Sequence, residues 1–94
     1  MSRVVVRRFV VSGKVQGVFF RASTKQHALS LGLSGYAKNL ADGSVEVFAV
    51  GELREVSELE QWLWHGPPTA RVEGVRQVEV EWEEAERYSS FVTM

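Results

Sequence analysis

Apolar and polar residues alternate most regularly in the C-terminal part of the chain. From Val75 to Glu84, the apolar residues Val78, Val80 and Trp82 are separated by single glutamates. A period of two is typical of a strand with one buried face and one solvated face. The segment from Val75 to Glu84 is therefore predicted to be a strand, and its glutamates are interpreted as a solvent-facing row rather than a cation site.

Other short apolar runs predict further strands. Val4–Ser12 is rich in β-branched residues, and the segments Ser34–Asn39 and Ser44–Val50 flank Asp42-Gly43. Asp-Gly is a strong hairpin signal because both residues tolerate the backbone angles of a tight turn. These segments predict an N-terminal strand and a β-hairpin, with Phe91–Thr93 as a candidate short strand near the end of the chain.

Two longer segments, Ala22–Leu33 and Leu53–His65, carry apolar residues along one helical face. Glycines at the end of the first segment suit a left-handed helix cap. Gly66-Pro67-Pro68 ends the second segment, because proline cannot continue a helix. Both segments are therefore predicted to be helices. Their face residues are Thr24, Ala28 and Leu31 in the first segment and Val56, Leu59 and Leu63 in the second.

The predicted order of elements is strand, helix, strand, strand, helix, strand. This order is typical of a ferredoxin-like sandwich, an α+β fold in which two helices cover one face of a four-stranded antiparallel sheet. A short fifth strand at the C-terminus would extend the sheet. The length of 94 residues predicts a single domain spanning residues 1–94. Because this fold hosts many unrelated functions, the function has to be inferred from particular residues.

Composition and charge narrow the chemistry. The sequence has no cysteine, which excludes disulfides, thiolate catalysis and cysteine-ligated metals. No apolar run is long enough for a signal peptide or a membrane span, so a cytoplasmic protein is expected. Residues 1–41 hold seven Lys or Arg and no acidic residue, whereas residues 42–94 hold four basic and all twelve acidic residues. The basic first half favours a small anionic substrate, unless strands of the two halves interleave and the asymmetry cancels.

The segment from Gly13 to Arg21 joins the first predicted strand to the first predicted helix. A loop that opens a helix leaves backbone N–H groups without partners, and these groups attract anions. Arg21 adds a planar charged group that fits two phosphate oxygens, so the segment is interpreted as a phosphate-binding loop. The alternative is a glycine-containing turn without a ligand. A Mg²⁺-nucleotide loop is disfavoured, because Val18 and Phe19 follow Gly17 where Lys and a hydroxyl would be needed.

Two stretches of the chain carry longer patterns. The first is Val11-x-Gly13-x-Val15-Gln16-Gly17-Val18-x-Phe20-Arg21. The second is Gly35-Tyr36-Ala37-Lys38-Asn39, three residues, Gly43-x-Val45, five residues and Gly51. They resemble the two signatures of the acylphosphatase family, in the family's order and spacing. The similarity extends more loosely to Gly66-Pro67-Pro68-x-Ala70 and Phe91-Val92, whereas Thr93-Met94 stands where a basic or aromatic ending is expected.

The resemblance implies an acylphosphatase, which hydrolyses the carboxyl–phosphate bond of acyl phosphates to carboxylate and inorganic phosphate by direct water attack, without metal or cofactor. It assigns binding of the phosphoryl group to Arg21 and orientation of the water to Asn39. The expected partners are a small-molecule acyl phosphate and inorganic phosphate, as product and competitor. Neither nucleic acid nor a membrane is expected as a partner, and the chain is expected to be a monomer. The backbone N–H groups expected to bind phosphate are those of Val15, Gln16, Gly17, Val18, Phe19 and Phe20.

Each assignment has a simpler alternative. Arg21 can be a solvated residue, although a positive charge at a helix start is unfavourable without an anion. Asn39 suits the turn that leads into Asp42-Gly43. His27 and His65 have no partner at metal-ligand spacing and are interpreted as structural or surface residues. The competing functions are a non-catalytic anion-binding module and an RNA-binding domain, and the chain lacks the aromatic motif of the latter.

Overall fold

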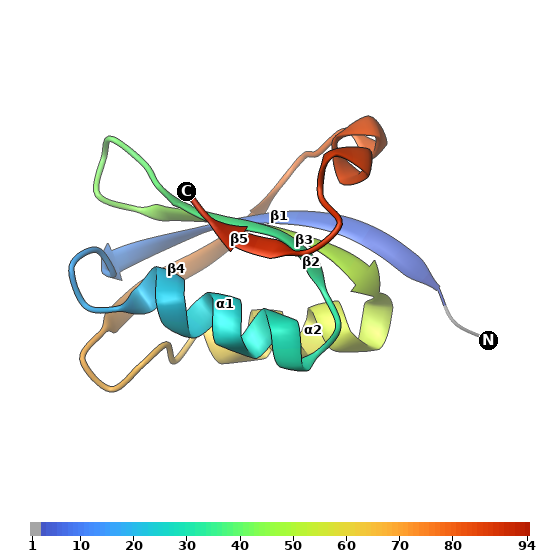
Figure 1. Ribbon diagram of the computed structural model, residues 1–94. Helices are drawn as coiled ribbons and strands as arrows, with labels where there is room; N and C mark the ends of the chain where they lie inside the picture. Colours follow the sequence, from blue (N-terminus) through green and yellow to red (C-terminus); the bar gives the residue numbers. More distant parts are fainter. Residues whose placement is uncertain (1–2) are drawn as a thin grey trace.

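The computed structural model describes residues 3–94, which form five strands, two α-helices and one 3₁₀-helix (Figure 1). The helices are α1 (Phe20–Ser30) and α2 (Leu53–Leu63), and the 3₁₀-helix η1 spans Trp82–Arg87. The order of β1 to β4 and the two α-helices along the chain is the predicted one. The strands are β1 (Val4–Lys14), β2 (Ser34–Asn39), β3 (Val45–Glu52), β4 (Arg71–Val78) and β5 (Phe91–Thr93).

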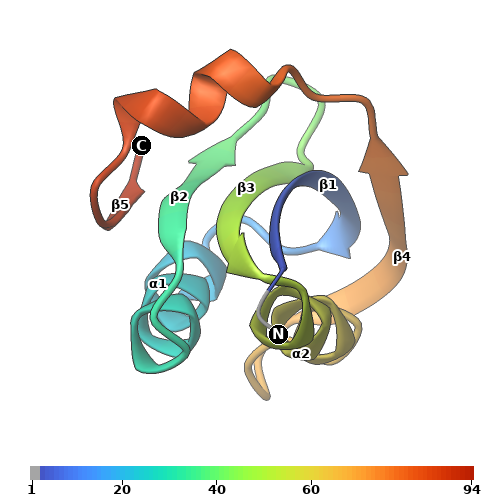
Figure 2. The same ribbon diagram turned by 90° about the vertical axis from the view of Figure 1, so that its right-hand side faces the viewer.

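One mixed sheet contains the five strands in the order β4-β1-β3-β2-β5. Neighbours among β1 to β4 are antiparallel, whereas β5 pairs with β2 in parallel. Both α-helices cover the same face of the sheet (Figure 1 and Figure 2). The α+β class, the two helices on one face and the fifth strand are confirmed. The expected four-stranded antiparallel sheet is wrong, because the sheet has five strands and is mixed.

The direction of β5 follows from the path of the chain after β4. Residues 79–90 cross the face of the sheet opposite the α-helices, from the β4 edge to the β2 edge (Figure 2). Phe91 then lies opposite Gly35 of β2, and its side chain is only 1% exposed. Burial of this side chain stabilises β5 in place, since a buried Phe side chain contributes about 1.5–3 kcal/mol.

The predicted strand from Val75 to Glu84 is wrong in its second half. β4 ends at Val78, and the chain turns into η1 at Trp82. Of the apolar residues that continue the alternation, Val80 packs on a second, smaller core on the outer face of the sheet, whereas Trp82 is 56% exposed. This outer core consists of Val6, Tyr36 and Phe48, with Val50, Val80, Ala85 and Tyr88 packed against them.

Polar contacts fasten the segment 79–90 to the sheet. Arg8 of β1 forms an ion pair with Glu84 and donates a hydrogen bond to the Glu79 carbonyl oxygen at 3.3 Å. Next to Arg8, the Tyr36 hydroxyl donates a hydrogen bond to Glu46. Burial, together with that bond to the Glu46 carboxylate, raises the pKa of Tyr36. Of the glutamates expected to form a solvent-facing row, Glu84 therefore binds the sheet through its side chain, whereas Glu79, Glu81, Glu83 and Glu86 are exposed.

The main core lies between the sheet and the α-helices, and it includes the predicted helix faces. α1 ends before Leu33 because Gly32 adopts a φ of 72° and the Leu33 N–H returns to the Ala28 carbonyl oxygen at 2.9 Å, which is typical of a left-handed helix end. The buried face residues are Thr24, Ala28, Val56, Leu59 and Leu63, and Leu31 is partly buried just beyond α1.

Within residues 3–94, no helix is long and apolar enough to cross a membrane.

Candidate active site

The loop between β1 and α1, residues 15–19, is shaped by unusual backbone geometry. β1 shifts register between Ser12 and Gly13, and a Cβ atom at Gly13 would lie 2.2 Å from the Arg71 carbonyl oxygen. Gly17 has a φ of 73°, and Phe19 has a φ of 62°, the one positive φ of a non-glycine residue in the described part of the chain. Such a conformation is costly for a bulky residue and concentrates at functional sites.

The backbone N–H groups of residues 15–20 are free to bind a ligand. Within residues 3–94, none of them donates a hydrogen bond to another part of the chain. α1 also begins without a side-chain cap and without an acidic residue in its first turn. Because the start of a helix carries partial positive charge and unpaired donors, the loop suits an anion.

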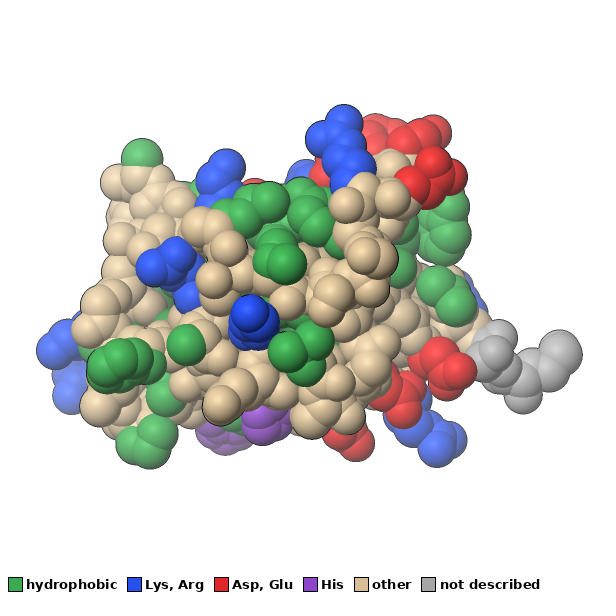
Figure 3. All heavy atoms as spheres, viewed as in Figure 1, with side chains coloured by type: hydrophobic (Ala, Val, Ile, Leu, Met, Phe, Trp, Pro, Cys, Tyr) green, Lys and Arg blue, Asp and Glu red, His purple; other side chains and the backbone are tan. Residues whose placement is uncertain are grey.

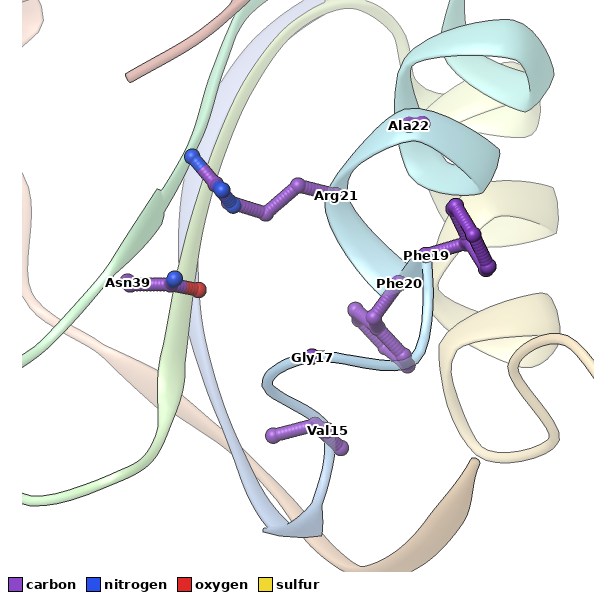
Figure 4. Close-up of a pocket in the computed structure, with 7 residues that line it drawn as sticks. All are labelled: Val15, Gly17, Phe19, Phe20, Arg21, Ala22 and Asn39. Atoms are coloured by element: carbon purple, nitrogen blue, oxygen red, sulfur yellow. The ribbon is translucent and has the colours of Figure 1, made fainter. Parts of the chain in front are cut away.

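A pocket of about 280 Å³ opens at this loop. Arg21 reaches into it from the first turn of α1, and Asn39 reaches into it from the end of β2 (Figure 4). The structure therefore brings the two predicted side chains together with the predicted loop. The pocket is lined by Val15, Gly17, Phe19, Phe20, Arg21, Ala22 and Asn39.

Arg21 is held by the C-terminal end of the sheet. Its Nη1 atom donates a hydrogen bond to the Met94 carbonyl oxygen at 2.6 Å, and the Met94 N–H donates to the Ala37 carbonyl oxygen at 2.8 Å. Within residues 3–94, the side-chain ion pairs are those of Arg8 with Glu46 and Glu84, and no aspartate or glutamate side chain pairs with Arg21. The charge of the guanidinium group is therefore available to an anion in the pocket.

Asn39 carries a buried acceptor without a partner. Its Oδ1 atom has no hydrogen-bond partner within residues 3–94. Buried polar atoms are normally paired, so this acceptor beside the pocket is available to a water or a ligand. This atom is the carboxamide oxygen that Figure 4 shows on the side of Asn39 toward the loop.

Two of the predicted loop residues, Gln16 and Val18, do not line the pocket with the others. The Gln16 side chain and the Val18 carbonyl oxygen fix the loop, while the backbone N–H groups of both residues have no hydrogen-bond acceptor within residues 3–94. The Gln16 side chain donates hydrogen bonds to the β2–β3 hairpin, and the Val18 carbonyl oxygen accepts one from Thr69 Oγ1 at 2.9 Å. Sequence reasoning considered only the backbone of Gln16 and passed over Thr69 and Met94. The one feature of the sequence that could have indicated a role for the Gln16 side chain was its position within the first signature.

Metal ligands and histidine partners are not gathered at this site. Within residues 3–94, no group of three or more His, Cys, Asp or Glu residues is placed to hold a metal ion. His27 is exposed and stacks on Trp62, with ring centroids 4.6 Å apart. His65 is exposed just beyond α2, and neither histidine lines the pocket.

Comparisons with known proteins identify the family of the chain. The family model described as Acylphosphatase matches residues 7–93. A protein of Alkalilimnicola ehrlichii named Acylphosphatase is 64% identical over 69 residues, which cover 73% of this chain and 78% of the relative. The structure of an acylphosphatase from Coxiella burnetii has a TM-score of 0.87 and 44% identity, covering 97% of this chain and 93% of the other.

A second solved structure, that of an acylphosphatase from Bacillus subtilis, has a TM-score of 0.84 at 26% identity, covering 98% of this chain and 99% of the other. Fold, pocket and similarity together define a hydrolase that acts on acid anhydrides. The chain belongs to the acylphosphatase family.

Proposed function

We propose that the chain hydrolyses acyl phosphates by attack of water on the phosphorus atom. The bond that breaks joins phosphorus to the carboxyl oxygen, and the products are a carboxylate and inorganic phosphate. A carboxylate is a stable anion that departs without protonation, so this reaction needs no strong general acid. The requirements that remain are a bound phosphoryl group, neutralisation of its charge and a positioned water.

The observation that carries this proposal is the meeting of three groups at one pocket. The free N–H groups of residues 15–20 and the unpaired charge of Arg21 would hold the equatorial phosphoryl oxygens, where charge resides in the transition state. Asn39 would accept a hydrogen bond from the attacking water through its unpaired Oδ1. Figure 4 shows the ends of the Arg21 and Asn39 side chains close to each other beside the loop, where the phosphoryl group would bind.

The distribution of charge supports an anionic substrate. In the view of Figure 3, acidic side chains gather over η1 and near the start of α2, whereas Lys and Arg predominate toward the end that carries the β1–α1 loop. The asymmetry seen along the sequence therefore persists on this face of the folded chain. A basic surface around a pocket raises the local concentration of anions and their rate of association.

We also infer that residues 1–94 act as one ferredoxin-like domain with an added edge strand, and as a monomer in the cytoplasm. Every group that the proposed site requires comes from one chain, so the proposed mechanism does not need a second subunit.

Turnover of benzoyl phosphate by the purified protein tests the proposed function. We expect the absorbance of the acyl phosphate to decay at a rate proportional to enzyme concentration, with inorganic phosphate as a competitive inhibitor. A protein that binds phosphate but leaves benzoyl phosphate intact would be the non-catalytic anion-binding module and would contradict the proposal.

Activity is expected to survive EDTA. The leaving group needs no Lewis acid, and the loop N–H groups and Arg21 supply the positive counter-charge within the proposed mechanism. The measurement compares the rate of benzoyl phosphate hydrolysis before and after dialysis against EDTA, with a buffer-dialysed sample as control. A large loss that is restored only by added divalent metal would show that the mechanism is incomplete.

A further inference from the structure

The side chain of Gln16 joins the phosphate-binding loop to the β2–β3 hairpin. Its Nε2 atom donates one hydrogen bond to the Leu40 carbonyl oxygen at 2.8 Å and another to the Ser44 carbonyl oxygen at 2.9 Å. Leu40 directly follows Asn39, the last residue of β2, and Ser44 directly precedes β3. Gln16 therefore connects the loop to the base of the hairpin that carries Asn39.

The two partners determine which end of the Gln16 carboxamide faces the hairpin. Both are carbonyl oxygens, which only accept hydrogen bonds, so the donor nitrogen must face them. The same carbonyls close the hairpin, because Leu40 N–H donates to the Ser44 oxygen at 2.9 Å and Gly43 N–H donates to the Leu40 oxygen at 3.2 Å. A change at Gln16 therefore acts directly on the hydrogen bonds that define the end of β2.

We propose that Gln16 is a positioning residue that sets the place of the Asn39 carboxamide relative to the phosphate-binding loop. Asn39 Oδ1 has no partner within residues 3–94 that would hold it there. Its position depends on the backbone at the end of β2, and Gln16 ties that backbone to the loop. The inference rests on the proposed function, in which Asn39 orients the attacking water.

Gln16→Met keeps the size of the side chain and removes both donors. We expect kcat for benzoyl phosphate to fall by about tenfold to a hundredfold, because a misplacement on the order of 1 Å in a positioned group has effects of that size. The inhibition constant of inorganic phosphate should change by less than about threefold, because the loop N–H groups and Arg21 still bind the phosphoryl group.

A double-mutant cycle with Asn39→Ala separates positioning from a general structural role. If Gln16 acts through Asn39, then Gln16→Met should lower kcat by less than about twofold once the carboxamide of Asn39 is absent. Thr69→Val is the matched control, because Thr69 holds the same loop through Val18 without contacting the hairpin. Its effect on kcat should be the same with and without Asn39→Ala.

Gln16→Glu provides a second test that does not depend on Gln16→Met folding well. A carboxylate has no donor for the two carbonyl oxygens, whereas a protonated carboxyl group can donate to one of them. The kcat relative to the parent should therefore rise severalfold as the pH falls toward about 4, near the ordinary pKa of glutamic acid. Hydrogen bonds from Ser44 lower the pKa of the nearby Asp42 below its ordinary value, and the parent protein, which also carries Asp42, is the reference for the ratio.

The possible results distinguish the role of Gln16 from the proposed hydrolysis of acyl phosphates. Equal losses from Gln16→Met in both backgrounds, or a ratio of kcat for Gln16→Glu that does not change with pH, would overturn the role of Gln16 alone. Absence of turnover in the parent would overturn the proposed function and this inference together. Thermal unfolding of each variant confirms that the comparison is made between folded proteins.

Discussion

Arg21→Lys is expected to lose nearly as much activity as Arg21→Ala, with kcat/KM for benzoyl phosphate falling on the order of a thousandfold in both. Arg21 presents a planar fork that can bind two phosphoryl oxygens and still donate to the Met94 carbonyl oxygen. Lysine keeps the charge but has neither the fork nor the geometry to satisfy both partners. The measurement is steady-state kinetics, together with titration of inorganic phosphate.

Lys25→Ala is the matched control for Arg21, because it removes a positive charge one turn further along α1 from a residue that does not line the pocket. This variant should stay within about threefold of the parent, since Lys25 does not line the pocket where the phosphoryl group would bind. If Arg21→Lys retained most of the activity, a point charge would suffice, and the proposed binding of two phosphoryl oxygens by Arg21 would be wrong.

Asn39→Ala is expected to lower kcat by on the order of a hundredfold or more, the scale of losing one positioning or transition-state contact. The inhibition constant of phosphate should change little, because Arg21 and the loop N–H groups are retained. The effects on kcat and on phosphate inhibition should differ because Asn39 lies at the end of β2, whereas the proposed phosphate-binding groups lie on the loop and on α1. Turnover and phosphate titration of the same samples provide the comparison.

Lys38→Ala offers a control on the same strand, because Lys38 is exposed and does not line the pocket. We expect near-parental turnover from this variant. A folded Asn39→Ala variant that lost phosphate affinity as severely as turnover would make Asn39 a binding residue. Full turnover would leave it as the residue that leads into the hairpin turn.

The loop and its neighbours were predictable because their signals are local. Two glycines and an arginine at the junction of a strand and a helix indicate an anion site from a few consecutive residues. The structure places Arg21 and Asn39 at one pocket as the family resemblance implied. The roles of these two residues stay predictions until the variants are measured.

The C-terminal third was harder to predict because its apolar pattern has two physical explanations. Val80 and Trp82 continue the alternation of β4, yet the chain leaves the sheet at Val78. Val80 is apolar because it packs on the outer core and not because it lies in a strand. A period of two cannot distinguish these cases, since burial on a second face of the sheet depends on the tertiary fold.

The remaining features that could not be predicted from the sequence are contacts between residues far apart in the chain. The bond from Gln16 to Leu40 and Ser44 spans more than twenty residues, and that from Arg21 to Met94 spans 73. The acceptors in all three hydrogen bonds are backbone oxygens and not side chains. Residue identity does not encode such acceptors, so they become visible only once the strands are paired.

Hydrolysis of benzoyl phosphate in oxygen-18-labelled water tests the central claim most directly, which is that the pocket binds the phosphoryl group and water attacks phosphorus. The account predicts that the label appears in inorganic phosphate, detected as an isotope shift in the phosphorus NMR spectrum, while benzoate remains unlabelled. Label in benzoate would show that water attacks the acyl carbon, and it would contradict the assignment of the loop, Arg21 and Asn39.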